Sequence, residues 1–223
     1  MMESSDGTNA CSVTYNPDKK LYYCFIAGNN DYPLEVFDIK GKNVYTGTIG
    51  MDARGLWYNP KYKQLEGTCY NNGYFSIPLT VEGFTQEPVY VNESVKFAGE
   101  QSVASFSPAN GEIYHFYDGK IHIYSRKKFK LKSSVVLSGL PCSLDEMNYT
   151  TMIYTGYKNY EFGFLDIVSK KIHLVNKSGK YSTSIELPAS AVTPDAFRFS
   201  YANDKVFLYN VDTRTWTGYT VFY

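Results

Sequence analysis

The sequence has few of the residues on which enzyme active sites most often depend. Among 223 residues there are three histidines and four cysteines, and no two cysteines are spaced as CxxC. We find no glycine-rich phosphate loop, no GxSxG nucleophile elbow, no HExxH motif and no EF-hand loop. Nothing in the chain therefore amounts to a catalytic or cofactor signature, and we expect no cofactor and no metal site.

An excess of charge of one sign is also missing. Lysine plus arginine and aspartate plus glutamate number 22 each, so the formal net charge is zero. Binding to nucleic acid or to an anionic membrane surface depends on a field of one sign, so we expect neither partner. The basic run RKKFKLK at 126–132 alternates with apolar residues. We interpret it as an exposed strand edge whose lysines block edge-to-edge pairing.

Long apolar runs are absent as well. No stretch approaches the roughly 18 apolar residues of a membrane-spanning helix, so we expect a soluble chain without membrane insertion. The start, MMESSDGTNA, has neither the basic beginning nor the apolar centre of a secretory signal. A doubled methionine would also arise from a start codon placed before a processed sequence. The compartment therefore stays open, and it would be extracytoplasmic if an export signal had been removed.

The cysteines do not define a disulfide framework. Four thiols allow three pairings, and the sequence cannot choose among them. Two of the four lie inside apolar runs typical of strands, where a thiol packs as a small hydrophobic group. The four residues are Cys11, Cys24, Cys69 and Cys142. We favour free thiols.

Signals for β-strands are abundant. Short runs rich in Val, Ile, Tyr, Phe and Thr alternate with Gly, Asn, Asp and Pro clusters about every 8 to 12 residues, as in sandwiches, barrels and propellers. No segment repeats apolar residues at helical spacing behind a capping residue. Aromatic residues make up 17% of the chain, and tyrosine suits packing between sheets as well as contact with sugars or proteins. We predict an all-β protein, with Trp57 and Trp216 in its core.

A longer period lies over the short one and favours a propeller. An aromatic residue recurs two positions before a turn residue. These pairs are Tyr15 and Pro17, Tyr58 and Pro60, Phe106 and Pro108, and Tyr201 and Asn203. Residues 142–157 fit a degenerate further copy that has lost its proline. Repeats of about 44 residues indicate stacked supersecondary units, and five of them account for the chain.

Two segments resemble repeats of a known superfamily. They are FSPANGEIYHFYDGKIHIY at 106–124 and YNPDKKLYYCFIAGNNDYPLEVFDI at 15–39. Both are similar to β-propeller repeats of the YVTN, NHL and WD-repeat kind, although the Trp-Asp and Gly-His signatures of WD repeats are absent. The resemblance covers most of the chain. It implies a β-propeller, which we expect to have five blades of four antiparallel strands, and it implies no particular chemistry.

We predict one propeller domain over residues 1–223. The approximate blade bounds are 11–50, 53–93, 102–138, 141–188 and 195–223. In the fourth blade, we place the innermost strand at 142–146 and interpret 182–187 as an insertion. The fifth blade then has three strands, because the first ten residues are too polar for an outer strand. An alternative register moves 182–187 into the fifth blade.

Propellers usually bind ligands at one mouth of the central channel, an expectation that rests on analogy of fold. The mouth that we consider is formed by loops leading from each outermost strand to the next innermost strand. Three of these loops carry a carboxylate, and two of the three carry an arginine close behind it. The residues are Asp52, Arg54, Glu100, Asp195 and Arg198. In this register, three acids and two guanidinium groups converge near one opening.

We therefore predict a non-catalytic, monomeric binding scaffold that recognises a protein or a carbohydrate ligand at this mouth. The competing hypothesis is a carbohydrate-active enzyme that uses Asp52, Glu100 and Asp195 as its acids. Paired carboxylates hydrolyse glycosidic bonds when they lie about 5 to 10 Å apart. The same acids could bind a cation or lie solvated in their loops. A receptor-like surface domain of a larger exported system is a third possibility.

His115 and His122 form a second candidate. The Asp118-Gly119 dipeptide favours a two-residue hairpin, which makes the two imidazoles direct cross-strand neighbours. Zinc needs three or four protein ligands, and the other histidine, His173, is distant in sequence. We predict a polar pair on a strand face and no metal site.

Overall fold

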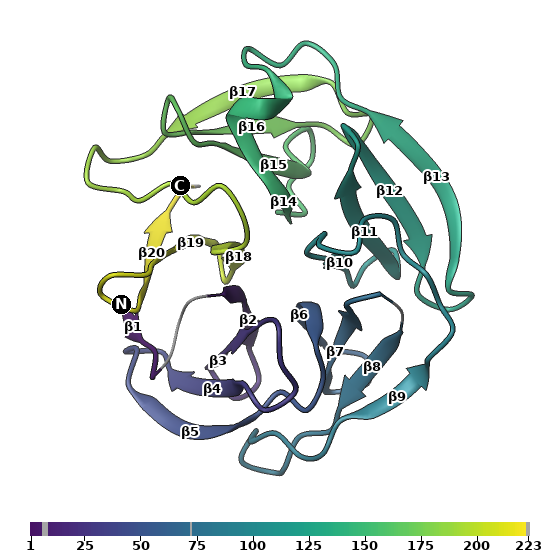
Figure 1. Cartoon of the computed structure of the whole chain (residues 1–223), viewed down its shortest axis with the longest axis vertical. Helices are drawn as coiled ribbons and strands as arrows, with labels where there is room; N and C mark the ends of the chain where they lie inside the picture. The colour runs from purple at the N-terminus through teal and green to yellow at the C-terminus, as the bar shows by residue number, and fades with distance from the viewer. Residues whose placement is uncertain (6–8, 72, 222–223) are drawn as a thin grey trace.

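The computed structural model describes residues 1–5, 9–71 and 73–221 and contains five four-stranded antiparallel sheets around a central axis (Figure 1). The prediction of an all-β, five-bladed propeller is confirmed. The described residues contain a single one-turn 3-10 helix, η1 (Leu144–Glu146), and none of their helices is long and apolar enough to cross a membrane. Residues 6–8 of the polar N-terminal segment and residues 222–223, at the end of the predicted fifth blade, lie outside the described residues.

Each blade runs from an innermost strand beside the axis to an outermost strand at the rim. Blade 1 consists of β2 (Ala10–Asn16), β3 (Leu21–Ile26), β4 (Pro33–Asp38) and β5 (Asn43–Thr48). Blade 2 consists of β6 (Ala53–Asn59), β7 (Gln64–Cys69), β8 (Tyr74–Ile77) and β9 (Val89–Asn92). Blade 3 consists of β10 (Ser105–Ser107), β11 (Glu112–Tyr117), β12 (Lys120–Ser125) and β13 (Lys130–Val136).

The fourth blade is shifted along the chain from its predicted position. It consists of β14 (Met147–Tyr154), β15 (Phe162–Asp166), β16 (Lys171–Val175) and β17 (Tyr181–Glu186). The predicted innermost strand at 142–146 is loop and η1, and the predicted insertion at 182–187 contributes the outermost strand. The physical reason is burial. Most of β14 is buried, as a strand packed between two blades must be, whereas residues 143–145 are exposed.

The fifth blade is completed by both ends of the chain (Figure 1). It consists of β18 (Phe199–Ala202), β19 (Lys205–Asn210), β20 (Thr215–Thr220) and β1 (Met2–Glu3). In β1, Met2 pairs with Trp216 and Glu3 with Thr215. The expectation of a three-stranded blade is wrong, as is the register that moved 182–187 here. A two-residue edge strand needs only one apolar anchor, and Met2 is 3% exposed.

The aromatic residues that mark the repeat occupy equivalent places. Each lies near the end of an innermost strand, and each packs into the interface with the preceding blade. Their cross-strand pairs are Tyr15 with Tyr22, Tyr58 with Leu65, Phe106 with Ile113, Tyr154 with Phe162, and Tyr201 with Val206. Tyr154 belongs to the degenerate copy, and its turn, like the one after Tyr201, has no proline.

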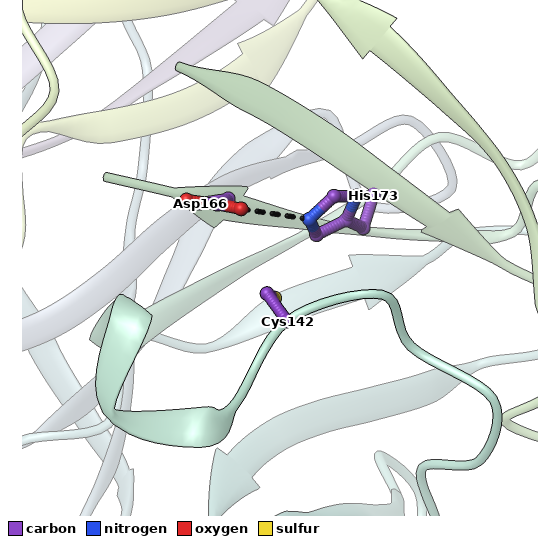
Figure 2. A group of neighbouring side chains, drawn as sticks. All are labelled: Cys142, Asp166 and His173. Atoms are coloured by element: carbon purple, nitrogen blue, oxygen red, sulfur yellow. Dashed lines mark hydrogen bonds and ion pairs between the residues drawn. The ribbon is translucent and has the colours of Figure 1, made fainter. Parts of the chain in front are cut away.

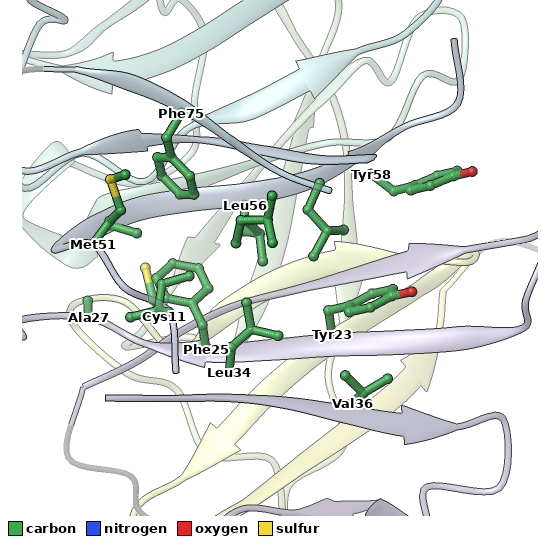
Figure 3. Close-up of a cluster of buried hydrophobic side chains, with 14 of the residues drawn as sticks. Cys11, Tyr23, Phe25, Ala27, Leu34, Val36, Met51, Leu56, Tyr58 and Phe75 are labelled. Carbon is green, nitrogen blue, oxygen red and sulfur yellow. The ribbon is translucent and has the colours of Figure 1, made fainter. Parts of the chain in front are cut away.

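An apolar cluster fills each interface between neighbouring blades. Figure 3 shows the interface of blades 1 and 2, where Phe25 and Leu34 lie opposite Leu56 and Phe75. Trp57 packs between blades 2 and 3 and Trp216 between blades 5 and 1, so both tryptophans are core residues as predicted. Strand β3 is buried along its whole length because other blades cover both of its faces.

The four cysteines are free thiols, as predicted. Cys11 and Cys24 are buried, and Cys69 and Cys142 are half-buried. Burial raises the pKa of Cys11 to about 12. This thiol therefore stays protonated at neutral pH and packs as an apolar group.

Candidate functional site

The mouth predicted from the sequence is bridged by one buried arginine. Arg54 is 5% exposed, forms an ion pair with Asp52, and donates from Nε to Gln101 Oε1 at 3.0 Å. Its guanidinium carbon lies 4.7 Å from the ring centroid of Tyr70 and 5.6 Å from that of Phe197. These partners come from blade 2, from the loop before blade 3 and from the loop before blade 5. Arg54 therefore contacts residues from three separate parts of the ring of blades.

The other residues predicted for this mouth lie outside that contact. Asp195 Oδ1 and Arg198 Nη2 form a separate ion pair at 3.1 Å, and the Asp195 side chain is exposed. Glu100 is exposed and lines a cavity of about 600 Å³ between the loop before blade 3 and the first residues of blade 4. The structure thus pairs Asp52 with Arg54 and Asp195 with Arg198, and places Glu100 in neither pair.

The opposite end of the channel holds a cavity of about 470 Å³. Its wall is formed by the five innermost strands and by the turns that follow them. The lining segments are 12–17, 56–60, 103–109, 151–156 and 199–203, within which most residues contribute. Every blade therefore takes part in one site.

The wall of this channel cavity is mostly apolar, with hydroxyl groups set into it. Serine and threonine hydroxyls, tyrosine and phenylalanine rings and proline turns line it, and within the described ranges no lining residue is Asp, Glu, Lys, Arg or His. Each innermost strand is also the edge strand of its sheet. The backbone groups along such an edge have no ladder partner on that side of the sheet, and several of them bond to the neighbouring innermost strand instead.

Hydroxyl groups hold the innermost strands to one another. Ser200 Oγ accepts a hydrogen bond from Val13 N and donates one to Val13 O, both at 2.9 Å. Thr14 Oγ1 accepts from Tyr58 N at 2.9 Å. These bonds join blade 5 to blade 1 and blade 1 to blade 2. The wall of the cavity is consequently pre-formed and does not depend on a ligand for its shape.

The tyrosines of the repeat place hydroxyl groups at this mouth. Tyr58 donates from its hydroxyl to Asp18 Oδ2 at 3.1 Å, and Ser107 Oγ donates to the Tyr154 hydroxyl at 3.1 Å. Burial, followed by the Asp18 carboxylate, raises the pKa of Tyr58 to about 12. The sequence marked these aromatic residues as repeat signals. Because each of them lies just before the first turn of its unit, their position in the sequence already indicates that they surround the same mouth of the channel.

The histidine pair is arranged as predicted. His115 and His122 are direct cross-strand partners. His115 stacks on Phe97 at 4.7 Å, and burial, followed by His122, lowers the pKa of His115 to about 3. His122 Nδ1 lies 3.0 Å from Ser134 Oγ, and its Nε2 lies 3.3 Å from Tyr117 O. Among the described residues, this pair belongs to no group of three side chains placed to share a metal ion.

In the described part of the chain, one group of three side chains is placed so that it could share a metal ion. Cys142, Asp166 and His173 each offer a ligand atom within 4.8 Å of the other two (Figure 2). Burial, followed by the carboxylates of Asp166 and Glu146, raises the pKa of Cys142 to about 11. The sequence analysis missed this group because its members come from a loop and two strands. No short spacing links them.

The chain is similar to several solved structures over nearly its whole length. Myxococcus xanthus glutaminyl cyclase matches with a TM-score of 0.58 and 15% identity, over 99% of this chain and 91% of that one. An auxiliary nutrient binding protein from Bacteroides thetaiotaomicron matches with a TM-score of 0.55 and 14% identity. That match covers 96% of this chain but only 59% of the other. A chain of the nidogen/laminin complex matches at 0.54 and 11% identity, over 95% and 76%.

No protein-family model and no curated protein sequence matches the chain. At 11–15% identity, the likeness to these structures concerns the fold alone. The similar structures include both an enzyme and a binding protein, so the fold is compatible with either activity. The chain is a five-bladed β-propeller.

Proposed function

We propose that this protein is a non-catalytic binding scaffold that holds a neutral saccharide unit of a glycan in the channel cavity. The observation that carries the proposal is a cavity to which all five blades contribute and whose lining, in the part of the chain that the structure describes, includes no charged residue. A sugar combines hydroxyl groups with apolar C–H faces. The cavity offers hydroxyl groups, aromatic rings and apolar side chains in return.

The size and rigidity of the cavity support this function. Its volume of about 470 Å³ lies within the range of roughly 300–1,000 Å³ typical of small-molecule sites. The wall is held by hydrogen bonds between neighbouring innermost strands, such as those from Ser200 and Thr14. A pre-formed wall lowers the entropic cost of binding, because few side chains have to be ordered by the ligand.

The carboxylates of the other mouth support binding over hydrolysis. A glycoside hydrolase needs two carboxyl groups that flank one glycosidic bond. Asp52 is engaged by the buried Arg54, and Asp195 by Arg198. The Bacteroides protein, which is a nutrient binding protein by name, is a precedent for a binding role in a similar structure. The proposal therefore moves the site to the end of the channel opposite the predicted mouth.

A pair of matched variants tests which mouth binds. Ala109 is exposed in a turn at the rim of the channel cavity, and Glu100 is exposed in a loop at the other mouth. A screen on arrays of neutral and acidic glycans supplies the ligand, and calorimetry measures its affinity. We expect Ala109→Trp to weaken binding at least about 10-fold, roughly 1.4 kcal/mol, and Glu100→Trp to leave it unchanged.

Other outcomes have defined meanings. The reverse pattern moves the site to the mouth of Asp52 and Glu100 and overturns the proposed location. Release of reducing sugar by the wild-type protein, lost in a combined Asp52→Asn and Asp195→Asn variant, establishes the enzyme hypothesis instead. Failure of every neutral glycan to bind the folded protein overturns the proposed ligand class.

A further inference from the structure

We propose that Cys142, Asp166 and His173 bind a divalent transition metal ion of the zinc type at the interface of blades 3 and 4. The three ligand atoms lie within 4.8 Å of one another. Thiolate sulfur, imidazole nitrogen and carboxylate oxygen are the ligands that Zn²⁺ accepts in proteins. Bond lengths of about 2.0–2.3 Å place tetrahedral ligands roughly 3–4 Å apart. A movement of about 1 Å by the Cys142 loop therefore brings the three ligand atoms to the separations expected around a tetrahedral ion.

Two of the ligands lie on rigid elements and the third on a loop. Asp166 ends β15, and His173 lies in the adjacent strand β16; they are 3% and 1% exposed. Cys142 belongs to the loop that leads from β13 of blade 3 to η1 and β14 of blade 4. Figure 2 shows its side chain directed toward the other two. A bound ion would clamp this loop onto blade 4.

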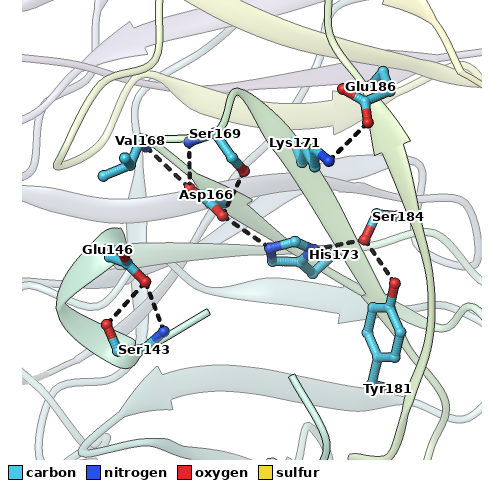
Figure 4. Close-up of polar contacts among 10 residues, drawn as sticks. All are labelled: Ser143, Glu146, Asp166, Val168, Ser169, Lys171, His173, Tyr181, Ser184 and Glu186. Atoms are coloured by element: carbon cyan, nitrogen blue, oxygen red, sulfur yellow. Dashed lines mark hydrogen bonds and ion pairs between the residues drawn. The ribbon is translucent and has the colours of Figure 1, made fainter. Parts of the chain in front are cut away.

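Hydrogen bonds orient the Asp166 carboxylate (Figure 4). Its Oδ1 accepts from Val168 N at 3.0 Å and from Ser169 N at 2.8 Å, and its Oδ2 accepts from Ser169 Oγ at 2.6 Å. Each oxygen therefore has a fixed direction before any ion binds. Such supporting bonds are a regular feature of metal-ligating carboxylates.

The imidazole of His173 is oriented in the same way. Its Nδ1 lies 2.8 Å from Ser184 Oγ, which lies 2.8 Å from the Tyr181 hydroxyl (Figure 4). Its Nε2 points at Asp166 Oδ2, 3.1 Å away. When Nδ1 donates its proton to Ser184, the Nε2 lone pair is left for the metal. Coordination replaces the proton of the Cys142 thiol, which is released to solvent.

The same geometry disfavours a catalytic triad in which Cys142 is the nucleophile. In a nucleophilic triad, one ring nitrogen of the histidine faces the nucleophile and the other faces the carboxylate. Here Nε2 of His173 faces Asp166, and Nδ1 faces Ser184. No ring nitrogen is left to act as the base for Cys142. Convergence of the three side chains on one point is the arrangement of ligands around an ion.

The propeller repeat supplies an internal control. His122 in β12 occupies the same place in blade 3 as His173 in blade 4, and each histidine pairs across the sheet with a serine, Ser134 or Ser184. Both serines lie within hydrogen-bond distance of Nδ1. In blade 3, however, Nε2 faces the backbone oxygen of Tyr117. The histidine and serine thus recur in blades 3 and 4, whereas the other two ligands are found only in blade 4 of this pair.

The site leaves room for a fourth ligand. A cavity of about 490 Å³ is lined by all three side chains together with Glu146, Lys171 and Thr183. Structural zinc sites have four protein ligands, whereas sites with three keep a position for water or for an exchangeable group. We therefore assign three protein ligands and one open position on the cavity side.

Cobalt substitution tests the site directly. The 223-residue chain is reduced, freed of metal with a chelator and titrated with Co²⁺, and Zn²⁺ is then added as a competitor. We expect one ion per chain, a sulfur-to-cobalt charge-transfer band, and displacement of cobalt by zinc. Folded wild-type protein that shows no such band and takes up no zinc overturns the proposal, whatever the variants do.

Variants identify the ligands. Cys142→Ser should abolish the charge-transfer band, and His173→Gln should abolish tight zinc binding. Ser184→Ala should weaken binding about 10-fold, because it removes only the orienting bond. The matched control is Cys69→Ser, which changes another half-buried thiol and should keep both signals. Far-ultraviolet circular dichroism checks each fold. A band that survives Cys142→Ser, or is lost in Cys69→Ser, places the ion elsewhere and overturns the assignment.

Discussion

Glu66 is a carboxylate buried at 0% exposure between blades 2 and 3, and its neighbours explain how it is tolerated. Asn59 Nδ2 donates to it at 2.8 Å and Gln64 Nε2 at 2.9 Å, and the Tyr74 hydroxyl and Arg126 donate as well. Burial acts to raise the pKa of Glu66, but the hydrogen bonds, led by the one from Arg126, hold it below the ordinary value of 4.5.

The Arg126→Met substitution tests this arrangement. It leaves Glu66 charged and buried without its cation, and it should lower the free energy of unfolding by about 3 kcal/mol near pH 7. Because the folded pKa of Glu66 is lowered in the wild type, its contribution is present above the unfolded pKa and is lost as pH falls through the folded pKa. The wild-type contribution should therefore stay constant from pH 7 down to the unfolded pKa near 4.5, and the difference between wild type and variant should shrink as the pH falls below that value.

Urea denaturation at several pH values measures both effects. Lys127→Met is the matched control, because Lys127 is the exposed neighbour of Arg126, and it should change stability by less than about 0.5 kcal/mol. A loss for Arg126→Met that stays constant with pH would show that Glu66 is not the group responsible.

The sequence predicts an exposed strand edge over the run 126–132. Residues 130–132 fit that description, whereas Arg126 does not.

Single residues also show why the candidate sites could be predicted only in part. The pairing of His115 with His122 followed from the hairpin between them, which is a local property. The contact of Arg54 with Phe197 joins residues that are distant in sequence. Whether an arginine of one blade reaches an aromatic ring of another depends on how the ring of blades closes. No local pattern carries that information.

At the scale of elements, the two-residue N-terminal strand β1 and the residues that follow it bind the chain's start to blades 5 and 1. Met2 packs in the cluster between blades 5 and 1. Beyond the strand, Ser4 Oγ donates to the buried carboxylate of Glu35, and Ser5 N donates to Glu35 Oε1 at 2.9 Å. Gly41, at φ +85°, passes so close that an added Cβ would lie 2.1 Å from Met1 O. The first five residues are thus bound to two blades.

Removal of residues 1–5 should therefore destabilise the protein strongly. The loss of buried Met2 costs about 1.5–3 kcal/mol, and a buried Glu35 deprived of two donors costs about 1–3 kcal/mol more. We expect a total of about 3–5 kcal/mol, measured by urea or thermal unfolding. Glu3→Gln, at an exposed position of the same strand, is the control and should be nearly neutral. A truncated protein as stable as the full chain would contradict the role of β1 in closing the ring.

The elements were predicted best where turn chemistry is regular. In blades 1 to 3, the turns after Tyr15, Tyr58 and Phe106 all contain proline, and the strands fall within the predicted blade bounds except for Ala10. In blade 4, the corresponding turn after Tyr154 has lost that proline, and the register shifted by one strand. Strand propensity alone could not correct the shift, because 151–157 looks equally apolar as a first or a second strand.

On the scale of the whole molecule, five apolar clusters join each blade to the next, and β1 pairs with β20 to complete blade 5. Each sheet depends on both neighbours for the burial of its faces. A closed ring of this kind has no free end from which unfolding can begin, unlike an open array of repeats. We therefore expect the chain to unfold as one cooperative unit.

The two tryptophans report on this cooperativity, since Trp57 and Trp216 lie in different interfaces. In each of the variants Trp57→Phe and Trp216→Phe, the fluorescence of the remaining tryptophan is followed beside far-ultraviolet circular dichroism. Within each variant the two transitions should have the same midpoint. Separate midpoints would show that part of the ring unfolds independently, and would contradict a single cooperative unit.

The sequence by itself determined that this protein is a propeller. Periodic turns, β-rich runs and aromatic residues before each turn are local features, and they are repeated often enough to define the period and the number of blades. Only the tertiary structure decided which mouth of the channel holds an uncharged cavity, which is bridged by Arg54, and that Cys142, Asp166 and His173 meet. The physical reason is that these sites combine side chains from different blades or from separate loops and strands, and their distances follow from blade packing and ring closure.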